Sequence, residues 1–520
     1  MKVIKFKHIL VLGLVMVLLT AAFIVSGLAK ANPEQTGDIV YATAYGMFFT
    51  KGGDCSTHYA GQGPLLGTTI YDPLIDCDVD LTYLPALAKS WKVAHDWSYV
   101  DFDLREGVKF HNGAIVTADD VQYSLAKHMN KKSRWVLGHD FRRRVKNSEV
   151  IDTYKVRFNL KDPFPGLWKR LWWDMGIFPK KYREAIGDKA FASKPIGAGP
   201  FKWLNYKQDV YFKIEAVKKH YRKTAEFKTL KFVYVSEAST RLAMLMAGEA
   251  DIIELSGRHI PVIKSDPNLR LLQTKHVIGT VLAYADLPFP EEKSPFLDIR
   301  VRKAASLAID RKLICEKILF GGSDPYGEVI TPYSLGWDPT VKPDPYDPER
   351  AKALLAEAGY PNGFKTVMGC TAPNRFWMEA IAANLADIGI KAKINVYEGG
   401  AWYGAYQGKK LRGLIVRNSW YDAEPHAAAD LTDAYMSKAP WCYHTTPEIE
   451  DALNKAQWAI EEKEVADWGR KISKLIRDSR INIHLWSASS SYGVNQKIIK
   501  WERQMGSYPG TRFEYMKIKH

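Results

Sequence analysis

Hydrophobic and polar residues alternate in two segments of the first third of the chain. Residues 100–104 are VDFDL and residues 156–160 are VRFNL. Because successive side chains of a strand point to opposite faces of a sheet, this period of two predicts two strands with one buried face each. The segments 38–43 and 230–235 predict two further strands.

Apolar residues spaced three or four apart predict helices between and after these strands. One helix is expected after Thr117, whose hydroxyl oxygen can accept from free amides, and another after Asp347, where a proline follows as the first helical residue. Further helices are expected over 239–247, from Pro447 onward and around 465–476. The sequence therefore predicts an α/β protein.

The N-terminus has the pattern of an export signal. Lysines precede an unbroken apolar run over 9–25, and small residues follow up to Ala31. We expect residues 1–31 to be a signal peptide that is cleaved after Ala31, so that the mature protein lies in the periplasm. An uncleaved membrane anchor is the alternative, because seventeen apolar residues are at the lower end of the spanning range. No cysteine lies near the cleavage point, so a lipoprotein is not expected.

Length and composition indicate a globular protein with more than one folded body. A chain of 520 residues exceeds the roughly 250–300 residues at which a single core stops growing. Its net charge of +15, with 25% charged residues, excludes neither a secreted enzyme nor a binding protein. Five cysteines are too few for a disulfide scaffold. Cys55 and Cys77 can pair in an oxidising compartment, with buried thiols as the alternative.

Motifs for catalysis or metal binding are missing from the sequence. It contains no Cys-x-x-Cys or His-x-x-x-His, and no nucleophile elbow or phosphate-binding loop. We therefore predict no catalytic residue, no metal and no cofactor. The basic run Arg142-Arg143-Arg144, with Lys146, either attracts an anion or forms a solvated face.

An ordered set of motifs extends through most of the chain. Residues 71–124 contain Tyr-Asp-x-Leu, then Pro-x-Leu-Ala-x-Ser-Trp, then Leu-Arg-x-Gly-Val-Lys-Phe-His-x-Gly. Further segments follow in order over 197–201, 237–252, 298–311 and 346–364. Taken together, they resemble the family 5 extracellular solute-binding proteins, which are the peptide, nickel and oligosaccharide receptors of ABC importers.

The resemblance implies a two-lobed type II periplasmic binding protein fold with an extra subdomain in the first lobe. Lobe I would comprise 32–280 and 485–520, with 71–199 as the extra subdomain, and lobe II would comprise 281–484. A solute enclosed between the lobes stabilises a closed state that a membrane permease can distinguish. The expected partners are a small-molecule solute and the permease subunits of an ABC importer, with no nucleic acid. We expect a monomer.

The resemblance also implies which residues line the cleft. In the peptide receptors a second-lobe segment Arg-x-x-Trp is followed by an Asp that holds the ammonium group of the ligand. Here Asp422 comes two residues after Trp420 instead of three, so its role is altered or absent, and a surface or turn-stabilising acid is the alternative. Core packing is the alternative for Trp402 and Tyr403. The predicted ligand-binding residues are Tyr45, Gly46, Met47, Phe48, Trp402, Tyr403, Arg417, Asn418, Ser419, Trp420, Tyr421 and Asp422.

The expected function is capture of a small peptide or peptide-like solute for import, without catalysis. Aromatic residues and Arg417 also suit an oligosaccharide or an aromatic, carboxylated solute, because a buried guanidinium needs an anion. Two other classes remain as alternatives. An exported hydrolase would turn over a captured solute, and a basic adhesion or chaperone-like surface protein would bind polyanions instead of a small molecule.

Overall fold

The computed structural model describes residues 35, 37–44, 52–57, 62–78, 82–130, 138–173, 175–419, 425–439, 441–501 and 512–519. The chain divides into two units, Met1–Thr36 and Gly37–His520, and every described helix and strand belongs to the second. The predicted signal peptide lies outside the described residues. None of the described helices is both long and apolar enough to span a membrane.

An 11-stranded mixed sheet runs through the second unit. Its order is β15-β14-β16-β12-β17-β11-β1-β10-β9-β8, and β13 pairs with β17 outside this path. Its strands are β1 (Asp38–Thr43), β8 (Phe201–Lys207), β9 (Tyr211–Ala216), β10 (Thr229–Tyr234), β11 (Ile252–Glu254), β12 (Leu269–Tyr284), β13 (Ser323–Pro325), β14 (Phe364–Thr371), β15 (Ile390–Tyr397), β16 (Leu414–Ser419) and β17 (Asn482–Asn495).

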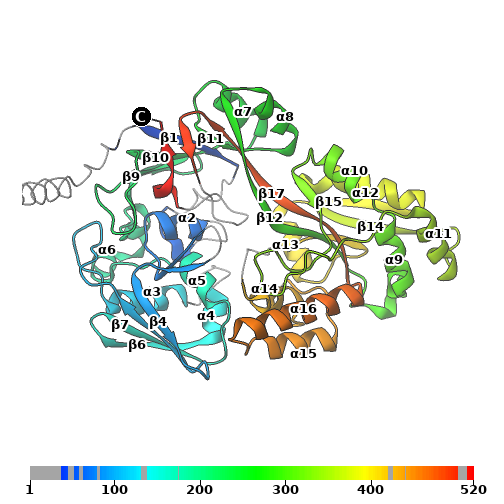
Figure 1. Ribbon diagram of the computed structural model, residues 1–520, viewed down its shortest axis with the longest axis horizontal. Coiled ribbons are helices and arrows are strands. Elements are labelled where there is room, and N and C mark those ends of the chain that lie inside the picture. The colour runs from blue at the N-terminus through cyan, green and yellow to red at the C-terminus, as the bar shows by residue number, and fades with distance from the viewer. Residues whose placement is uncertain are drawn as a thin grey trace, which may run out of the picture. The chain divides into compact units, whose positions relative to one another are not determined.

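Two long antiparallel strands, β12 and β17, connect the two parts of this sheet. Leu269 pairs with Asn495 at one end, and Ala283 pairs with Asn482 at the other. Near the first end β17 also pairs with β11, and near the second end β12 also pairs with β16. Figure 1 shows both strands passing from the part with β1 and β10 to the part with β14 and β16. The crossings predicted near 280 and 485 fall on these strands, while the lobe boundaries themselves stay a prediction.

Three smaller sheets complete the strand structure. The strands predicted over 100–104 and 156–160 are neighbours in a four-stranded antiparallel sheet, where Phe102 pairs with Val156. This sheet has the order β4-β5-β7-β6, and the other two are the pairs β2-β3 and β18-β19. The strands are β2 (Ile75–Cys77), β3 (Tyr83–Pro85), β4 (Ala88–Val93), β5 (Tyr99–Leu104), β6 (Val145–Asp152), β7 (Lys155–Leu160), β18 (Ile498–Lys500) and β19 (Lys517–Ile518).

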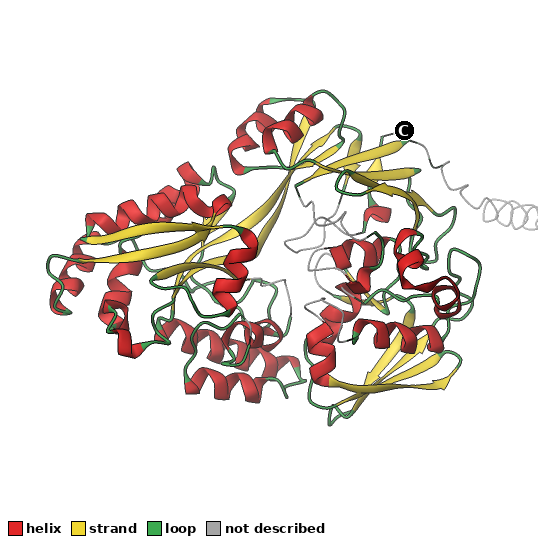
Figure 2. Ribbon diagram, turned by 180° about the vertical axis from the view of Figure 1, so that it is seen from behind, coloured by secondary structure: helices red, strands yellow, loops and turns green. Residues whose placement is uncertain are grey.

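Helices pack beside the sheets, and Figure 2 shows them on both sides of the strands β14 and β15. All five predicted helices are present, as α3, α7, α11, α15 and α16. The helices are α2 (Gln62–Thr69), α3 (Ala118–His128), α4 (Gly138–Arg144), α5 (Leu167–Trp173), α6 (Lys180–Ser193), α7 (Ala238–Met246), α8 (Ile260–Ser265), α9 (Ile299–Leu307), α10 (Arg311–Leu313), α11 (Pro348–Glu357), α12 (Arg375–Asp387), α13 (Gly399–Gln407), α14 (Ala427–Tyr435), α15 (Pro447–Ala456) and α16 (Glu462–Ser479).

The two helix N-termini predicted from capping residues are capped by those residues. The Asp347 side chain accepts from the Arg350 amide at 2.9 Å and caps α11, as predicted. At α3, Thr117 and Asp120 form a capping box, in which the Thr117 side chain faces the backbone amide of Asp120 and the Asp120 side chain accepts from the Thr117 amide. The Thr117 hydroxyl and backbone amide both donate to Oδ2 of Asp120, each at 3.0 Å.

The buried apolar residues form separate cores along the chain. In core A every buried member lies between Leu282 and Trp486. In core B every buried member lies between Leu74 and Ala198, and core C combines residues of β1, β9, β10 and the C-terminal segment. Core A therefore belongs to the part of the sheet with β14 and β16, whereas core B belongs to the four-stranded sheet. The division into lobe II and the extra subdomain stays a prediction.

A buried ion network around Arg222 joins three distant parts of the chain. Its guanidinium lies 2.7 Å from Oδ1 of Asp72 and 3.0 Å from both Oδ2 of Asp76 and Oε1 of Glu514. A second cation, Arg512, lies 3.7 Å from Asp76. Burial, the largest single cause, raises the pKa of Asp72, but the charge of Arg222 and the contacts with His220 and Tyr221 together outweigh it, so that the pKa is lowered. Burial raises the pKa of Glu514. Ion pairs through Arg222 thus connect Glu514 of the C-terminal segment with Asp72 and Asp76, which lie between α2 and the middle of β2.

Candidate functional site

Arg417 lies on β16, where the predicted ligand-binding segment begins. Its side chain is 6% exposed, and its guanidinium carbon lies 4.3 Å from the ring centre of Tyr435 on α14. Val281 of β12 pairs with Arg417 on one side and with His484 of β17 on the other. Because paired residues share a face of the sheet, Arg417 and His484 lie on the same face. Burial, followed by nearby arginines, lowers the pKa of His484 to about 3, so its imidazole is neutral.

Helix α13 places its two predicted rings in different surroundings. Trp402 is 8% exposed and belongs to an aromatic core in which its ring centre lies 6.1 Å from that of Tyr406. Tyr403 is 44% exposed, with its ring centre 5.7 Å from that of Trp441. Adjacent helical residues point about 100° apart, which explains the difference. Trp402 thus fills a core, and contact of either ring with a solute stays a prediction.

The other predicted ligand-binding residues fall largely outside the described part of the chain. This holds for the residues Tyr45, Gly46, Met47, Phe48, Trp420, Tyr421 and Asp422. Asn418 and Ser419 end β16, and the structure describes their backbone but not their side chains. Their proposed contacts therefore stay predictions. The strand β1, which precedes the predicted binding loop over 45–48, ends next to Glu254. The Glu254 carboxylate accepts from the Ala44 amide and from the Thr43 hydroxyl, each at 2.9 Å.

Cys55 and Cys77, for which the sequence leaves a disulfide and buried thiols open, lie in different cores. Cys55 belongs to core C, and Cys77 belongs to core B, where its sulfur lies 3.7 Å from the carbonyl oxygen of Asp78. Both are buried thiols in the structure, which does not support a disulfide between them. Among the described residues, no group of three or more His, Cys, Asp or Glu side chains is placed to hold a metal ion.

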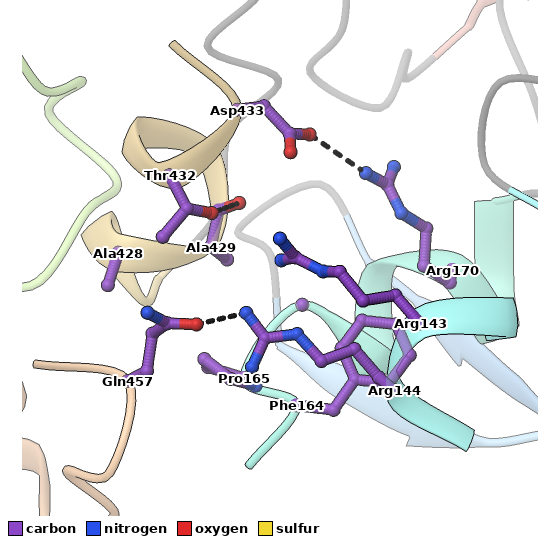
Figure 3. Close-up of a pocket in the computed structure, with 11 residues that line it drawn as sticks. Arg143, Arg144, Phe164, Pro165, Arg170, Ala428, Ala429, Thr432, Asp433 and Gln457 are labelled. Carbon is purple, nitrogen blue, oxygen red and sulfur yellow. Dashed lines mark hydrogen bonds and ion pairs between the residues drawn. The ribbon is translucent and has the colours of Figure 1, made fainter. Parts of the chain in front are cut away.

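A cavity lies where the region around α4 and α5 meets α14. Arg143, Arg144 and Arg170 line it from the first side, and Thr432 and Asp433 line it from the second. In Figure 3 the three guanidinium groups point toward α14. Its volume is about 20 Å³. Phe164 of core B and Ala428 of core A also line the cavity, so it lies where two separate cores come together.

Two polar contacts cross this cavity. Nη2 of Arg144 donates to Oε1 of Gln457, and Nη2 of Arg170 lies 3.5 Å from Oδ2 of Asp433 (Figure 3). Arg144 is also held on its own side, where Nη1 donates to the Pro163 carbonyl oxygen at 2.5 Å. The first is a hydrogen bond from a charged guanidinium to a neutral side-chain amide, and the second is an ion pair in which the Asp433 side chain is 38% exposed.

In the sequence, the only indication of this cavity was the basic run over 142–144, which was expected either to attract an anion or to form a solvated face. Arg144 is buried at 9% exposure, whereas Arg143 is exposed and Arg142 is half-buried. The sequence did not indicate Arg170, Asp433 or Gln457. Arg170 lies in an apolar helix, and the other two face α4 and α5 only after both cores have folded.

Several buried histidines predict a loss of stability in mild acid. Burial is the main cause that lowers the pKa to about 4 in His128, whose ring stacks on Phe178 with centres 5.1 Å apart. The unfolded chain binds the proton below a pKa of about 6.5, so this contribution is complete above pH 6.5 and is lost as the pH falls toward 4. The loss amounts to about 3 kcal/mol for His128. Burial also lowers the pKa of the half-buried His111 and His426 to about 4 and that of the half-buried His484 to about 3, and it lowers the pKa of His259 and His444.

Urea unfolding at pH 7 and pH 5 measures this effect. His128→Gln should reduce the difference in unfolding free energy between the two pH values, whereas the same change at the exposed His95 should leave it unchanged. An equal response of both variants would show that His128 does not carry the pH dependence.

Comparison with known proteins places this fold in a family. Residues 82–438 match the family described as bacterial extracellular solute-binding proteins, family 5, middle. The chain is 31% identical over 359 residues to heme-binding protein A of Haemophilus influenzae, a match that covers 63% of this chain and 65% of that protein, slightly less than two thirds. It is 28% identical over 386 residues to the dipeptide-binding protein of Escherichia coli, covering 68% and 70% of the two chains.

Solved structures show the same fold. NikA from Brucella suis in complex with Fe(III)-EDTA superimposes with a TM-score of 0.82 at 20% identity, covering 93% of this chain and all of that one. HbpA2 from Haemophilus parasuis superimposes with a TM-score of 0.77 at 22% identity, also covering 93% of this chain and all of that one. The type II periplasmic binding protein fold predicted from the sequence is thereby confirmed.

Proposed function

Because the chain belongs to the family 5 bacterial extracellular solute-binding proteins, we propose that it is the receptor of an ABC importer that captures a small peptide-like solute between two lobes. The observation that carries this proposal is the family match over 82–438 together with the contact between cores A and B. A solute bound between two such bodies stabilises their closed arrangement, which a permease can distinguish. Capture and release need no bond to be made or broken.

We propose a peptide-like solute because several similar proteins are named as peptide-binding proteins. The dipeptide-binding protein of Escherichia coli and di/tripeptide-binding protein 1 of Pseudomonas aeruginosa are each 28% identical to this chain. We propose that the contacts come from the segment Arg417 to Asp422, with Tyr403 and the loop over 45–48 as further candidates. The short spacing between Trp420 and Asp422 argues for a solute whose amine is held differently from that of the usual peptide ligands. We also propose export to the periplasm, with cleavage after Ala31, and a monomeric state.

The solute can be identified directly. Native mass spectrometry of protein purified from its own periplasm should show a bound small molecule. A thermal-shift screen of dipeptides, tripeptides, glutathione, heme, sugars and aromatic acids should then raise the melting temperature, because a ligand that binds only the folded state at a hundredfold excess over Kd stabilises it by about 2.7 kcal/mol. Absence of any bound molecule and of any shift would contradict the proposal, as would turnover of a captured solute.

Trp420→Ala tests the proposed contact segment. The variant should lose the thermal shift that the identified compound produces, while its unliganded melting temperature stays nearly unchanged. Phe376→Ala, at a half-exposed ring on α12, is the matched control and should keep the shift. A large loss of unliganded stability in the Trp420 variant would instead mean that this ring packs in a core.

A further inference from the structure

The chain enters its second unit at a surface that is rich in lysine. Gly37 and Asp38, the first residues of this unit, are both exposed, and the Gly37 carbonyl oxygen accepts from the Lys228 amide at 2.9 Å. The Lys213 ammonium lies 3.4 Å from Oδ2 of Asp38, and the Lys497 ammonium donates to the Asp38 carbonyl oxygen. Lysines from three distant segments thus surround the point at which the chain enters the fold.

Further lysines extend this surface on two sides. On the sheet, Lys231 of β10 is directly opposite Lys213 of β9. At the pair β18-β19, Lys517 and Lys519 are exposed on either side of the buried Ile518. We call these lysines together the basic rim, which consists of Lys213, Lys228, Lys231, Lys497, Lys517 and Lys519.

The two acids that pair with the basic rim balance only part of its charge. Asp38 pairs with Lys213, and Asp251 lies 3.6 Å from the Lys497 ammonium. Like charges directly opposite each other, as in the lysine pair of β9 and β10, destabilise a sheet. Four members of the rim form no ion pair within the part of the chain that the structure describes, namely Lys228, Lys231, Lys517 and Lys519. A negatively charged surface outside the protein would relieve this repulsion.

The segment before Gly37 indicates which surface this is. The apolar run over 9–25 is long enough to enter a bilayer, and the eleven residues 26–36 join it to Gly37. Eleven residues reach at most about 40 Å when fully extended, so an apolar run held in a bilayer keeps the basic rim close to the lipid headgroups. Anionic lipids attract basic residues that lie close to the membrane.

An exposed apolar side chain lies beside the lysines. Ile499 of β18 is 52% exposed, and its carbonyl oxygen accepts from Nη1 of Arg270 at 2.9 Å. Basic groups around an apolar residue suit a bilayer surface, because the apolar group enters the headgroup region while the cations stay at the phosphates. A soluble acidic partner would be held by the charge alone.

We propose that the basic rim binds the surface of a bilayer that contains anionic phospholipids. The contact is reversible and weakens as the ionic strength rises, because it depends mainly on charge and no helix has to insert. The proposal goes beyond the proposed function, since the rim needs no solute. A receptor that rests on the membrane meets its permease at a higher effective concentration than one that diffuses freely.

Sedimentation with lipid vesicles tests the proposal. The chain from Asn32 onward is used, because it contains the whole second unit, with every described helix and strand, and lacks the apolar run. It should bind vesicles of equal parts phosphatidylglycerol and phosphatidylcholine, and not vesicles of phosphatidylcholine alone. High salt should release it. Changing Lys228, Lys517 and Lys519 together to glutamine should weaken this binding by about tenfold or more.

The matched control changes Lys365, Lys391 and Lys393 to glutamine. These lysines are exposed on β14 and β15, so the control removes the same charge from a different part of the sheet and should bind vesicles like the parent protein. Both variants should melt at the temperature of the parent protein, because all six side chains are exposed.

Equal binding to both kinds of vesicle, or no binding to either, would overturn the proposal. An equal loss of affinity in the two variants would also overturn it, since only net charge would then matter. If polyglutamate in solution binds as tightly as the anionic vesicles, the partner is an acidic polymer and the membrane is excluded. Failure of the proposed function would instead appear as the absence of a co-purified solute, which vesicle binding does not affect.

Discussion

Replacing Arg222 with methionine is expected to lower the free energy of unfolding by about 3–5 kcal/mol. The change removes the cation that lies within 3.0 Å of Asp72, Asp76 and Glu514, while these three carboxyl groups stay buried. Breaking a buried ion pair by removing one partner leaves an uncompensated charge in a region of low dielectric constant. Methionine keeps much of the side-chain volume, so the loss reports charge more than packing. Urea unfolding at pH 7 measures it.

The matched control is Arg350→Met, at an exposed pair in which Arg350 lies 2.8 Å from Glu357. Exposed pairs contribute about 0–1 kcal/mol, so this variant should be almost as stable as the parent protein. The Arg222 variant should also recover part of its deficit as the pH falls toward 4, because its unpaired carboxyl groups then take up protons in the folded state. A deficit that is small, or that does not change with pH, would contradict the role assigned to the network.

Replacing Trp402 with alanine is expected to cost about 3–5 kcal/mol of unfolding free energy, as for other buried aromatic residues. The ring is 8% exposed and contacts Tyr397 and Tyr406 in the aromatic core, so its removal leaves a cavity. Tyr403→Ala, one residue further along α13, should cost less than about 1 kcal/mol because that ring is 44% exposed. Urea unfolding of the two variants makes the comparison.

The same pair of variants separates packing from solute contact. If Tyr403 contacts the solute, its variant should keep its stability and lose affinity for the compound found by mass spectrometry. A Trp402 variant with unchanged unliganded stability but lost affinity would contradict the placement of this ring in the core.

Local elements were predictable because each depends on residues close in sequence. The VDFDL and VRFNL patterns predicted β5 and β7, and Asp347 with Pro348 predicted the start of α11. The same holds at α3, where Thr117 is the N-cap residue as predicted, while the additional hydrogen bond from its hydroxyl to Asp120 was not predicted.

The candidate site was predictable only in part. The resemblance pointed to Arg417, which lies on β16, and to α13, where the sequence left core packing and ligand contact open for Trp402 and Tyr403. Their different burial depends on how α13 is rotated against β14 and β16, which adjacent aromatic residues in a sequence do not reveal. The cavity lined by Arg143, Arg144 and Arg170 combines residues of two cores, so no single segment carries its pattern.

The sequence by itself determined that this is an α/β protein with an N-terminal pattern for export and with the ordered motifs of one receptor family. Hydrophobic spacing, capping residues and the individual motifs are properties of short segments, so they can be recognised without knowing how the rest of the chain folds. Only the tertiary structure decided which charges meet. Arg144 and Gln457 are 313 positions apart, and Arg222 joins carboxyl groups from opposite ends of the chain. Such contacts form when separately folded parts come together, and no local pattern records them.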